Sequence, residues 1–301
     1  MKKWLIAIRA PFFTAAIAPA VLGVAVAFYE GYAVNWWRAV VALVGLVAIH
    51  GGTNLANDYF DHRTRNDWVN LTPTPFSGGS RVIQQGAISP RAILTYSLAC
   101  FAVGIVCGLY LWRVTPGNVV LWLGLAGVAC GFLYTAIPVA IGYRGVGEFV
   151  VGLNFGPLAV LGAHYVQAGR LSPGALMASV PLGLLIAAVL YINEFPDYEA
   201  DRQVNKKTLV VLLGPERARY GYFALLLLTY GSLITFAAIG GLPTWALLAL
   251  ATAPLGAKAT MVLMRHYREP YKLLPANGLT IIVHFATGIL LAVGLALGRA
   301  A

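Results

Sequence analysis

Two short acidic segments of this 301-residue chain follow the same pattern. They read NDYFD at residues 57–61 and NEFPD at residues 193–197, each with Asn, an acid, two non-acidic residues and Asp. The pattern is unusual because the chain is 59% hydrophobic and has only 11 acidic residues. Most of the acids fall in two windows around these segments: Asp58, Asp61, Asp67, Glu194, Asp197, Glu199 and Asp201.

The spacing within each window places the polar residues along one face of a helix. The residues that share a face are Asn54, Asp58 and Asp61 in the first window and Asn193, Asp197 and Asp201 in the second. Carboxylates stacked in this way repel each other unless a cation lies between them. Clustered oxygen ligands suit Mg²⁺, which bridges carboxylates to phosphate oxygens. We therefore expect Mg²⁺ to be bound by Asn57, Asp58, Asp61, Glu194, Asp197 and Asp201. The alternative is two solvated helix ends.

Basic residues follow each acidic window. The first is followed by Arg63 and by the segment SGGSR, which ends at Arg81, and the second by Lys206 and Lys207. Paired glycines can expose backbone N–H groups to a phosphate, and Arg and Lys supply the positive charge. Taken alone, the glycines are better explained by an ordinary turn. Together, the acids and bases favour a magnesium–diphosphate site, with Asn54 and Asn193 continuing each acidic face inward.

The elements that must position these residues are apolar segments of membrane-spanning length. About nine of them, each near the 20 residues needed to cross a bilayer, are found near residues 10–29, 37–57, 92–112, 118–137, 145–164, 174–195, 219–239, 242–264 and 277–297. They are continuously apolar rather than alternating, which predicts helices and not strands. Three histidines lie within them, His50, His164 and His284, and we interpret these as residues that pack or form hydrogen bonds between helices.

The net charge of +10 is distributed by membrane side. Sixteen of the 21 Lys and Arg residues fall at the N-terminus or in every second connection after it. The positive-inside rule then places the N-terminus in the cytoplasm and both acidic windows at the cytoplasmic face of the cell membrane. The basic surplus follows from topology, and we predict no nucleic-acid partner.

The paired motifs resemble those of the UbiA superfamily of intramembrane prenyltransferases. The first family motif is matched by Asn57, Asp58, Asp61 and Asp67, and the second by Asp197 and Asp201 followed by Lys206, Lys207, Thr208 and Leu209. Segments 9–11, 73–83 and 142–169 are most similar to 1,4-dihydroxy-2-naphthoate prenyltransferases, which make menaquinone precursors. The resemblance implies an all-α bundle of about nine transmembrane helices, and Mg²⁺-dependent transfer of a polyprenyl group from its diphosphate to an aromatic acceptor. We expect one domain over residues 1–301, with two similar halves at about 1–140 and 141–301.

Further substrate-binding residues follow from this mechanism. Tyr134 and Tyr143 could face an allylic cation with their rings, although Tyr is also a common interfacial anchor. Arg9 or Arg144 could hold an acceptor carboxylate. Glu148 could orient a basic residue or the acceptor, or pair with Arg144 one turn away. The full set that we expect to contact substrate is Arg9, Arg63, Asp67, Arg81, Tyr134, Tyr143, Arg144, Glu148, Lys206 and Lys207.

Other functions fit parts of the pattern. A different acceptor, such as 4-hydroxybenzoate, a chlorin or a glycerol phosphate, would use the same acidic clusters. A terpene cyclase on the same scaffold would release diphosphate without an aromatic acceptor. A secondary transporter also has duplicated halves and intramembrane acids, but its acids usually lie near the middle of the membrane and not at one face.

Overall fold

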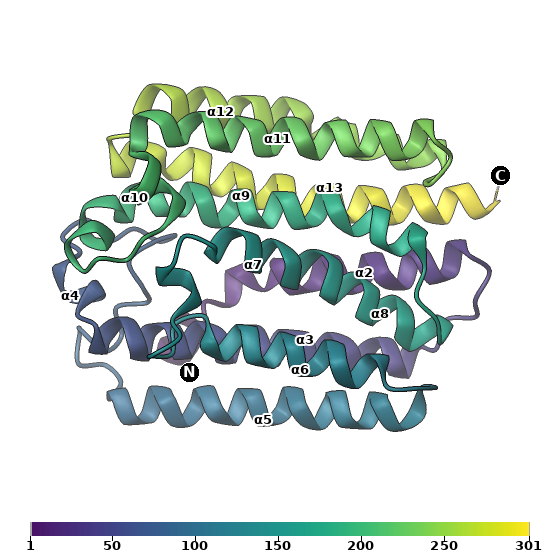
Figure 1. The fold of residues 1–301 in the computed structure, drawn as a ribbon, viewed down its shortest axis with the longest axis horizontal. Coiled ribbons are helices and arrows are strands. Elements are labelled where there is room, and N and C mark those ends of the chain that lie inside the picture. The colour runs from purple at the N-terminus through teal and green to yellow at the C-terminus, as the bar shows by residue number, and fades with distance from the viewer. Residues whose placement is uncertain (1, 301) are drawn as a thin grey trace.

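The computed structural model describes residues 2–300, which form a bundle of roughly parallel and antiparallel helices (Figure 1). The first half contains α1 (Lys2–Ala7), η1 (Ala10–Phe13), α2 (Thr14–Tyr29), α3 (Trp36–Arg63), α4 (Asn66–Val69), α5 (Pro90–Val114) and α6 (Val119–Leu133). The centre contains η2 (Ile141–Tyr143), α7 (Gly147–Leu153), η3 (Asn154–Leu158), α8 (Ala159–Ala168) and α9 (Pro173–Gln203). The last part contains α10 (Leu209–Leu213), α11 (Pro215–Ala238), η4 (Thr244–Thr252), α12 (Ala253–His266), η5 (Pro270–Leu273) and α13 (Leu274–Ala300).

Eight of the helices, some of them formed by two consecutive elements, are long and apolar enough to cross a membrane. The all-helical bundle expected from the sequence is confirmed, and no strand is found over residues 2–300. The ninth expected span, near 118–137, corresponds to α6, a shorter apolar helix of 15 residues. It ends at Leu133 because the chain turns away at Tyr134, so α6 is shorter than the roughly 20 residues that a perpendicular crossing requires.

Short polar caps fix where the long helices begin. The side chains of Asn35, Ser89 and Ser172 each accept a hydrogen bond from the backbone N–H three residues later, at the start of α3, α5 and α9. Proline occupies the first position of α5 and α9, where no intrahelical donor is needed. The caps of α3 and α9 lie at the opposite end of each helix from its acidic window, whereas the cap of α5 follows the loop after the first window.

The core is built around α9, which lies in the interior of the bundle between α11 and α7 (Figure 1). Leu182 and Leu185 of α9 are fully buried in two neighbouring apolar clusters. Small residues allow close helix contacts, as where a Cβ on Gly156 would lie 2.6 Å from the Gly183 Cα atom. By contrast, α5 lies at one edge of the bundle, and several of its apolar side chains, such as Val106, are exposed on the surface.

Candidate active site

The first acidic cluster is formed by the last two turns of α3 and by the short helix α4. Asp58, Asp61 and Asp67 are all buried, with 2–4% of their surface exposed. Asp58 forms an ion pair with Arg9, whose Nη2 lies 2.5 Å from Asp58 Oδ1. The same guanidinium nitrogen donates to Asn57 Oδ1 at 2.8 Å. Arg9 therefore ties the N-terminal segment to the end of α3.

Asp61 has different partners on the opposite side of the cluster. Its Oδ1 accepts a hydrogen bond from the Tyr143 hydroxyl at 2.7 Å, and its Oδ2 accepts one from Asn57 Nδ2 at 3.0 Å. The Tyr143 hydroxyl also lies 2.8 Å from Thr64 Oγ1. A residue of the connection after α6 is thereby fixed against the end of α3.

The second acidic cluster, on the last turns of α9, contacts the first through two asparagines. Asn66 Nδ2 donates to Asp201 Oδ1 at 3.0 Å, and Asn70 Nδ2 donates to Asp197 Oδ1 at 2.7 Å. These residues are more than 120 positions apart in the chain. The two acidic windows therefore lie against each other in the structure.

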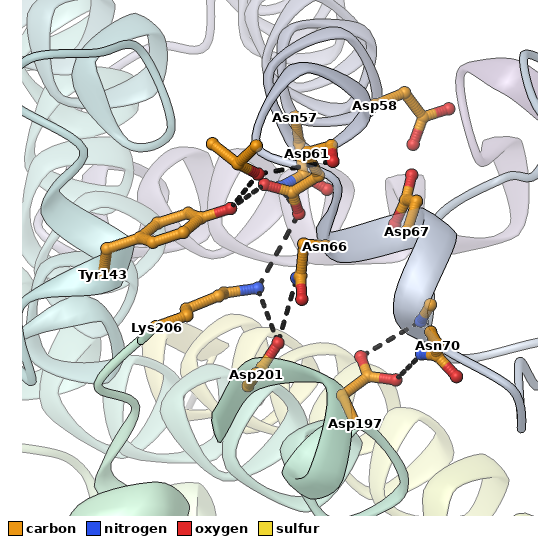
Figure 2. Close-up of polar contacts among 12 residues, drawn as sticks. Asn57, Asp58, Asp61, Asn66, Asp67, Asn70, Tyr143, Asp197, Asp201 and Lys206 are labelled. Atoms are coloured by element: carbon orange, nitrogen blue, oxygen red, sulfur yellow. Dashed lines mark hydrogen bonds and ion pairs between the residues drawn. The ribbon is translucent and has the colours of Figure 1, made fainter. Parts of the chain in front are cut away.

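Lys206 occupies the space between the two clusters (Figure 2). Its ammonium nitrogen lies 3.4 Å from Asp201 Oδ1 and 3.7 Å from Asp61 Oδ2. Burial favours the neutral form of this amine, but Asp201 and Asp61 outweigh burial and raise the pKa of Lys206 well above its ordinary value. The two carboxylates therefore favour the charged form of Lys206.

The SGGSR segment, residues 77–81, closes one side of the site. The backbone N–H of Gly78 donates to Asp197 Oδ2 at 3.0 Å, and that of Ser80 donates to Asp58 Oδ1 at 3.2 Å. Gly79 has φ +74°, and a Cβ at this position would lie 2.6 Å from Asp67 Oδ2. Glycine is required here because the backbone must approach the carboxylate closely. In this arrangement the loop N–H groups bind carboxylates of both clusters.

A cavity of about 460 Å³ leads from the acidic clusters into the bundle. Its polar end is lined by Arg9, Asn57, Asp61, Asp67, Glu194, Asp197, Asp201 and Lys206. Its apolar part is lined by α3, α5, α6 and the α7–α8 segment, including Leu46, Ile105, Leu121 and Ala163. The site thus combines a charged mouth with a long hydrophobic interior.

The sequence matches the model of the UbiA prenyltransferase family over residues 16–285. The chain belongs to the UbiA prenyltransferase family. A 1,4-dihydroxy-2-naphthoate octaprenyltransferase of Mycobacterium tuberculosis is 34% identical over 286 residues, which is 93% of each chain. A 2-carboxy-1,4-naphthoquinone phytyltransferase of Synechocystis is 30% identical, covering 97% of this chain and 92% of that one. This protein is therefore a prenyltransferase with multiple membrane-spanning helices.

Solved structures of UbiA homologues share the fold. The apo structure of a homologue from Aeropyrum pernix superposes with a TM-score of 0.68 at 19% identity, covering 96% of this chain and 98% of that one. A homologue from Archaeoglobus fulgidus bound to GPP and Mg²⁺ has a TM-score of 0.64 at 18% identity, covering 96% and 99%.

In this UbiA prenyltransferase, some of the site residues expected from the sequence line the cavity and others do not. The polar end of the cavity collects most of the acids, together with Asn57, Arg9 and Lys206, and both Asn54 and Asn193 line it farther in. Tyr134 lines the cavity. Tyr143 does not line it, but its hydroxyl donates a hydrogen bond to Asp61, which does. Asp58 does not line the cavity, because its carboxylate is turned toward Arg9 and Ser80.

Three basic residues expected at the substrate do not line the cavity. Arg63, Arg144 and Lys207 are exposed. The Arg144 guanidinium donates to the backbone carbonyls of Val139 and Pro138, so it neither faces the site nor pairs with Glu148. Their positions differ from the expectation because sequence adjacency does not fix the direction of a side chain in a loop.

Two further expected residues hold the loops of the site in place. Glu148 accepts a hydrogen bond from the backbone N–H of Leu209 at 2.7 Å, at the start of α10. Arg81 donates to the backbone carbonyl of Asp67 and so braces the SGGSR segment against α4. Each of them contacts the backbone and not the cavity.

Sequence reasoning missed residues that the structure brings to the site. Asn66 and Asn70 join the two clusters, and an available signal was that Asn66–Asp67 repeats the Asn–Asp pair at Asn57–Asp58. The sequence indicates packing or an interhelix hydrogen bond for His50, but His50 lines the cavity, its Nδ1 has no hydrogen-bond partner, and its ring centroid lies 4.8 Å from that of Phe155. Only the register of α3 in the bundle shows this.

The donor set of the site fits Mg²⁺. Five carboxylates line the charged mouth, on Asp61, Asp67, Glu194, Asp197 and Asp201, and a sixth, on Asp58, faces Arg9 and Ser80. Arg9 pairs with Asp58, and Lys206 pairs with Asp61 and Asp201. Burial raises the pKa of the Asp67 carboxyl well above its ordinary value, and Asp61 and Asp58 raise it further. Over residues 2–300 no three ligand side chains are already arranged around a metal position. The excess of hard oxygen donors is what a divalent cation would neutralise.

Proposed function

We propose that this enzyme transfers a polyprenyl group from its allylic diphosphate to 1,4-dihydroxy-2-naphthoate, with Mg²⁺ as cofactor, in menaquinone biosynthesis. The observation that supports it most directly is one cavity in which two facing acidic clusters open into a long apolar interior. The naphthoate-acting relatives, similar over nearly the whole chain, favour this acceptor. A UbiA homologue with GPP and Mg²⁺ bound supports the donor and the metal.

The charged mouth is the position for the diphosphate. Asp61, Asp67, Asp197 and Asp201, with Asn57, would hold Mg²⁺ there. When bound, the metal supplies charge neutralisation for the diphosphate leaving group. Lys206 adds a donor already placed between the clusters, where it can bind a phosphate oxygen as the carbon–oxygen bond breaks.

The cavity wall next to the mouth suits a reacting allylic carbon. Tyr134 lines the cavity and can present its ring face to developing positive charge. The helix bundle excludes bulk water, which would otherwise capture the carbon as an alcohol. Arg9 lines the same region and is the cation that we assign to the acceptor carboxylate, since Arg144 is exposed.

The bonds of the transfer balance without an added oxidant. The ring carbon that bears the carboxylate forms a bond to C1 of the prenyl group, while the C1–oxygen bond breaks and diphosphate leaves. The carboxylate then departs as CO₂, and the electron pair of its bond restores aromaticity to the ring. His50 and Asn54 line the cavity just inside the mouth, where the ring hydroxyls would lie.

The distribution of basic residues supports a membrane orientation. We propose that the chain lies in the cell membrane with its N-terminus and the charged mouth at the cytoplasmic side. The two facing acidic clusters also support a single domain with two similar halves, at about residues 1–140 and 141–301.

The test is an acceptor panel with purified enzyme in nanodiscs, geranylgeranyl diphosphate and Mg²⁺. We expect the highest kcat/KM with 1,4-dihydroxy-2-naphthoate, with one CO₂ released for each prenylated product. Chelation should abolish turnover, and added Mg²⁺ should restore it. Faster turnover of 4-hydroxybenzoate or a chlorin would contradict the acceptor assignment. Diphosphate release at the same rate without any acceptor would indicate a cyclase.

A further inference from the structure

We propose that His50 is the base of the transfer. Its imidazole takes the proton of the acceptor hydroxyl next to the carboxylate while the ring attacks the prenyl carbon, and it returns the proton after CO₂ has left. This inference rests on the proposed function, since it concerns the same acceptor in the same cavity.

The position of His50 is the first observation. Four polar residues of α3 line the cavity at a spacing of four, three and four positions: His50, Asn54, Asn57 and Asp61. This spacing forms one stripe on the helix, which runs from the charged mouth into the interior. The residues of α3 that line the cavity farther in, such as Leu46, are apolar or glycine. His50 is therefore the inner end of the polar stripe.

The ring of His50 is fixed by packing and not by hydrogen bonds. Its centroid lies 5.6 Å from that of Phe13 and 4.8 Å from that of Phe155, both in edge contacts. Its Nδ1 is buried without a partner, and no hydrogen bond to its Nε2 is found over residues 2–300. Because neither nitrogen is engaged by the protein, either tautomer is available, and the nitrogen that faces a ligand can accept a proton.

The other histidines differ from His50. Three of them, His62, His164 and His266, contact neighbouring polar side chains at hydrogen-bond distance. The fourth, His284 of α13, is buried and its Nε2 has no partner, but it does not line the cavity. His50 alone among the five combines an unpartnered imidazole nitrogen with a place on the cavity wall. An ionisable side chain in such a position within a membrane protein is usually functional.

The N-terminal segment links His50 to the site that we assign to the acceptor carboxylate. Arg9 Nη2 lies 2.8 Å from Asn57 Oδ1, and Phe13, four residues later, contacts the His50 ring. The guanidinium is thus at the level of Asn57, about 10 Å from the level of His50 along α3. A carboxylate and an adjacent hydroxyl span about 4 Å, and a hydrogen bond of about 3 Å at each end gives about 10 Å. One acceptor can therefore contact both residues.

The proton movement balances within the acceptor. As the ring carbon attacks C1 of the prenyl group, the O–H bond breaks, His50 takes the proton and the oxygen becomes a ketone. The carboxylate is then β to that ketone, and its carbon–carbon bond breaks to release CO₂. The electron pair of that bond moves to the ketone oxygen, which takes the proton back from His50 and restores the aromatic ring. No proton is gained or lost overall.

The neighbouring polar groups are weaker candidates for this base. Thr53, Asn54 and Asn193 also line the cavity, but hydroxyl and amide groups do not take up a proton near neutral pH. Glu194 is a carboxylate that lines the cavity on α9. Its substitution therefore distinguishes the two candidates.

The first test compares His50→Asn with His284→Asn, the buried histidine outside the cavity. With 1,4-dihydroxy-2-naphthoate, His50→Asn should lower kcat about 100-fold, the lower end of what a positioned base contributes. The KM for geranylgeranyl diphosphate should change less than threefold. His284→Asn should keep both values within threefold of the wild type. Equal losses in the two variants, or a kcat in His50→Asn within tenfold of the wild type, would overturn the proposal.

The second test methylates one acceptor hydroxyl at a time. Methylation of the hydroxyl next to the carboxylate removes the proton that His50 takes, so it should lower kcat/KM at least tenfold more in the wild type than in His50→Asn. Methylation of the other hydroxyl should cost the two enzymes the same. If the extra cost of the first methylation is lost in Glu194→Gln and persists in His50→Asn, Glu194 is the base and the proposal is overturned.

The third test omits the acceptor. The slow release of diphosphate from geranylgeranyl diphosphate with Mg²⁺ should proceed at the same rate in the wild type and in His50→Asn, because the base acts on the acceptor alone. An equal rate also shows that the variant is folded and binds the donor. A release rate that falls as much as kcat would place the defect at the donor or in the fold and would overturn the proposal.

The outcomes separate this inference from the proposed function. If the wild type prenylates the naphthoate and His50→Asn behaves like His284→Asn, the role of His50 fails and the proposed function stands. If the wild type instead prenylates another hydroxylated aromatic acid, and methylation of its hydroxyl costs the wild type more than His50→Asn, the acceptor assignment fails and the role of His50 stands. If no hydroxylated aromatic acid is prenylated, both fail.

Discussion

Lys206 Nζ lies 3.4 Å from Asp201 Oδ1, at the centre of the site and between two acidic clusters that are more than 120 residues apart in the sequence. The lysine ammonium and a divalent cation would compete for the same carboxylates, whereas a diphosphate would be attracted by either positive charge. The role of Lys206 can be tested because its loss should have opposite effects on binding of the metal and on binding of the diphosphate.

Replacement of Lys206 by Gln should weaken binding of the prenyl diphosphate and strengthen binding of the metal. We expect kcat/KM for the prenyl diphosphate to fall at least tenfold, because a fixed donor to phosphate is lost. The concentration of Mn²⁺ needed for half-maximal binding, measured by electron paramagnetic resonance, should decrease, because Asp61 and Asp201 lose their competing cation. Arg202→Gln removes the same charge from an exposed neighbour and should change both values less than threefold. Weaker Mn²⁺ binding in Lys206→Gln would contradict this role.

The carboxylates that line the cavity should be needed for turnover and not for folding. Asp61→Asn and Asp201→Asn should each lower kcat at least 100-fold, because they remove charge that serves the metal. Glu199→Gln, an exposed position on the same helix as Asp201, is the control and should retain more than half of the activity. Circular dichroism and gel filtration would show whether the variants stay folded. Near-normal kcat in either Asn variant would exclude that residue from the metal site.

Gly79 should be needed for its contact with Asp67 as well as for its backbone conformation. Gly79→Ala places a methyl group against the Asp67 carboxylate and should lower kcat at least tenfold. Gly86 has a similar φ of +67°, but a Cβ there meets nothing within 4 Å. Gly86→Ala should therefore share the backbone cost, about 1 kcal/mol, and keep its activity. Equal activity in the two variants would show that the contact with Asp67 is unimportant.

The ion pair of Arg9 with Asp58 should contribute to stability, because the Asp58 carboxylate is buried. In a double-mutant cycle of Arg9→Gln and Asp58→Asn, we expect a coupling energy of about 1–3 kcal/mol in the free energy of unfolding. The exposed pair Arg268–Glu216, with side chains 66% and 62% exposed, is the reference and should give less than about 1 kcal/mol. A smaller coupling for Arg9 and Asp58 than for the exposed pair would show that the pair is not structural.

The sequence by itself was sufficient for the membrane bundle and for the existence of two acidic windows. Long apolar segments can satisfy their backbone groups in lipid only as helices or closed barrels, so composition and length determined the helices. The spacing of Asp58 and Asp61, and of Asp197 and Asp201, placed each pair on a helix face, because the helical period is a local property. These inferences depended on residues within two or three turns of each other.

The tertiary structure alone decided how the side chains of the site are used. Asp58 turns to Arg9, Asn66 reaches Asp201, and Lys206 rather than Lys207 enters the site, because each contact depends on how distant segments pack. The same is true of Gly108 and Gly156, since a glycine that leaves open space and one that allows close packing look alike in a sequence. Directions of side chains and depths of cavities are set by long-range packing, which no local pattern encodes.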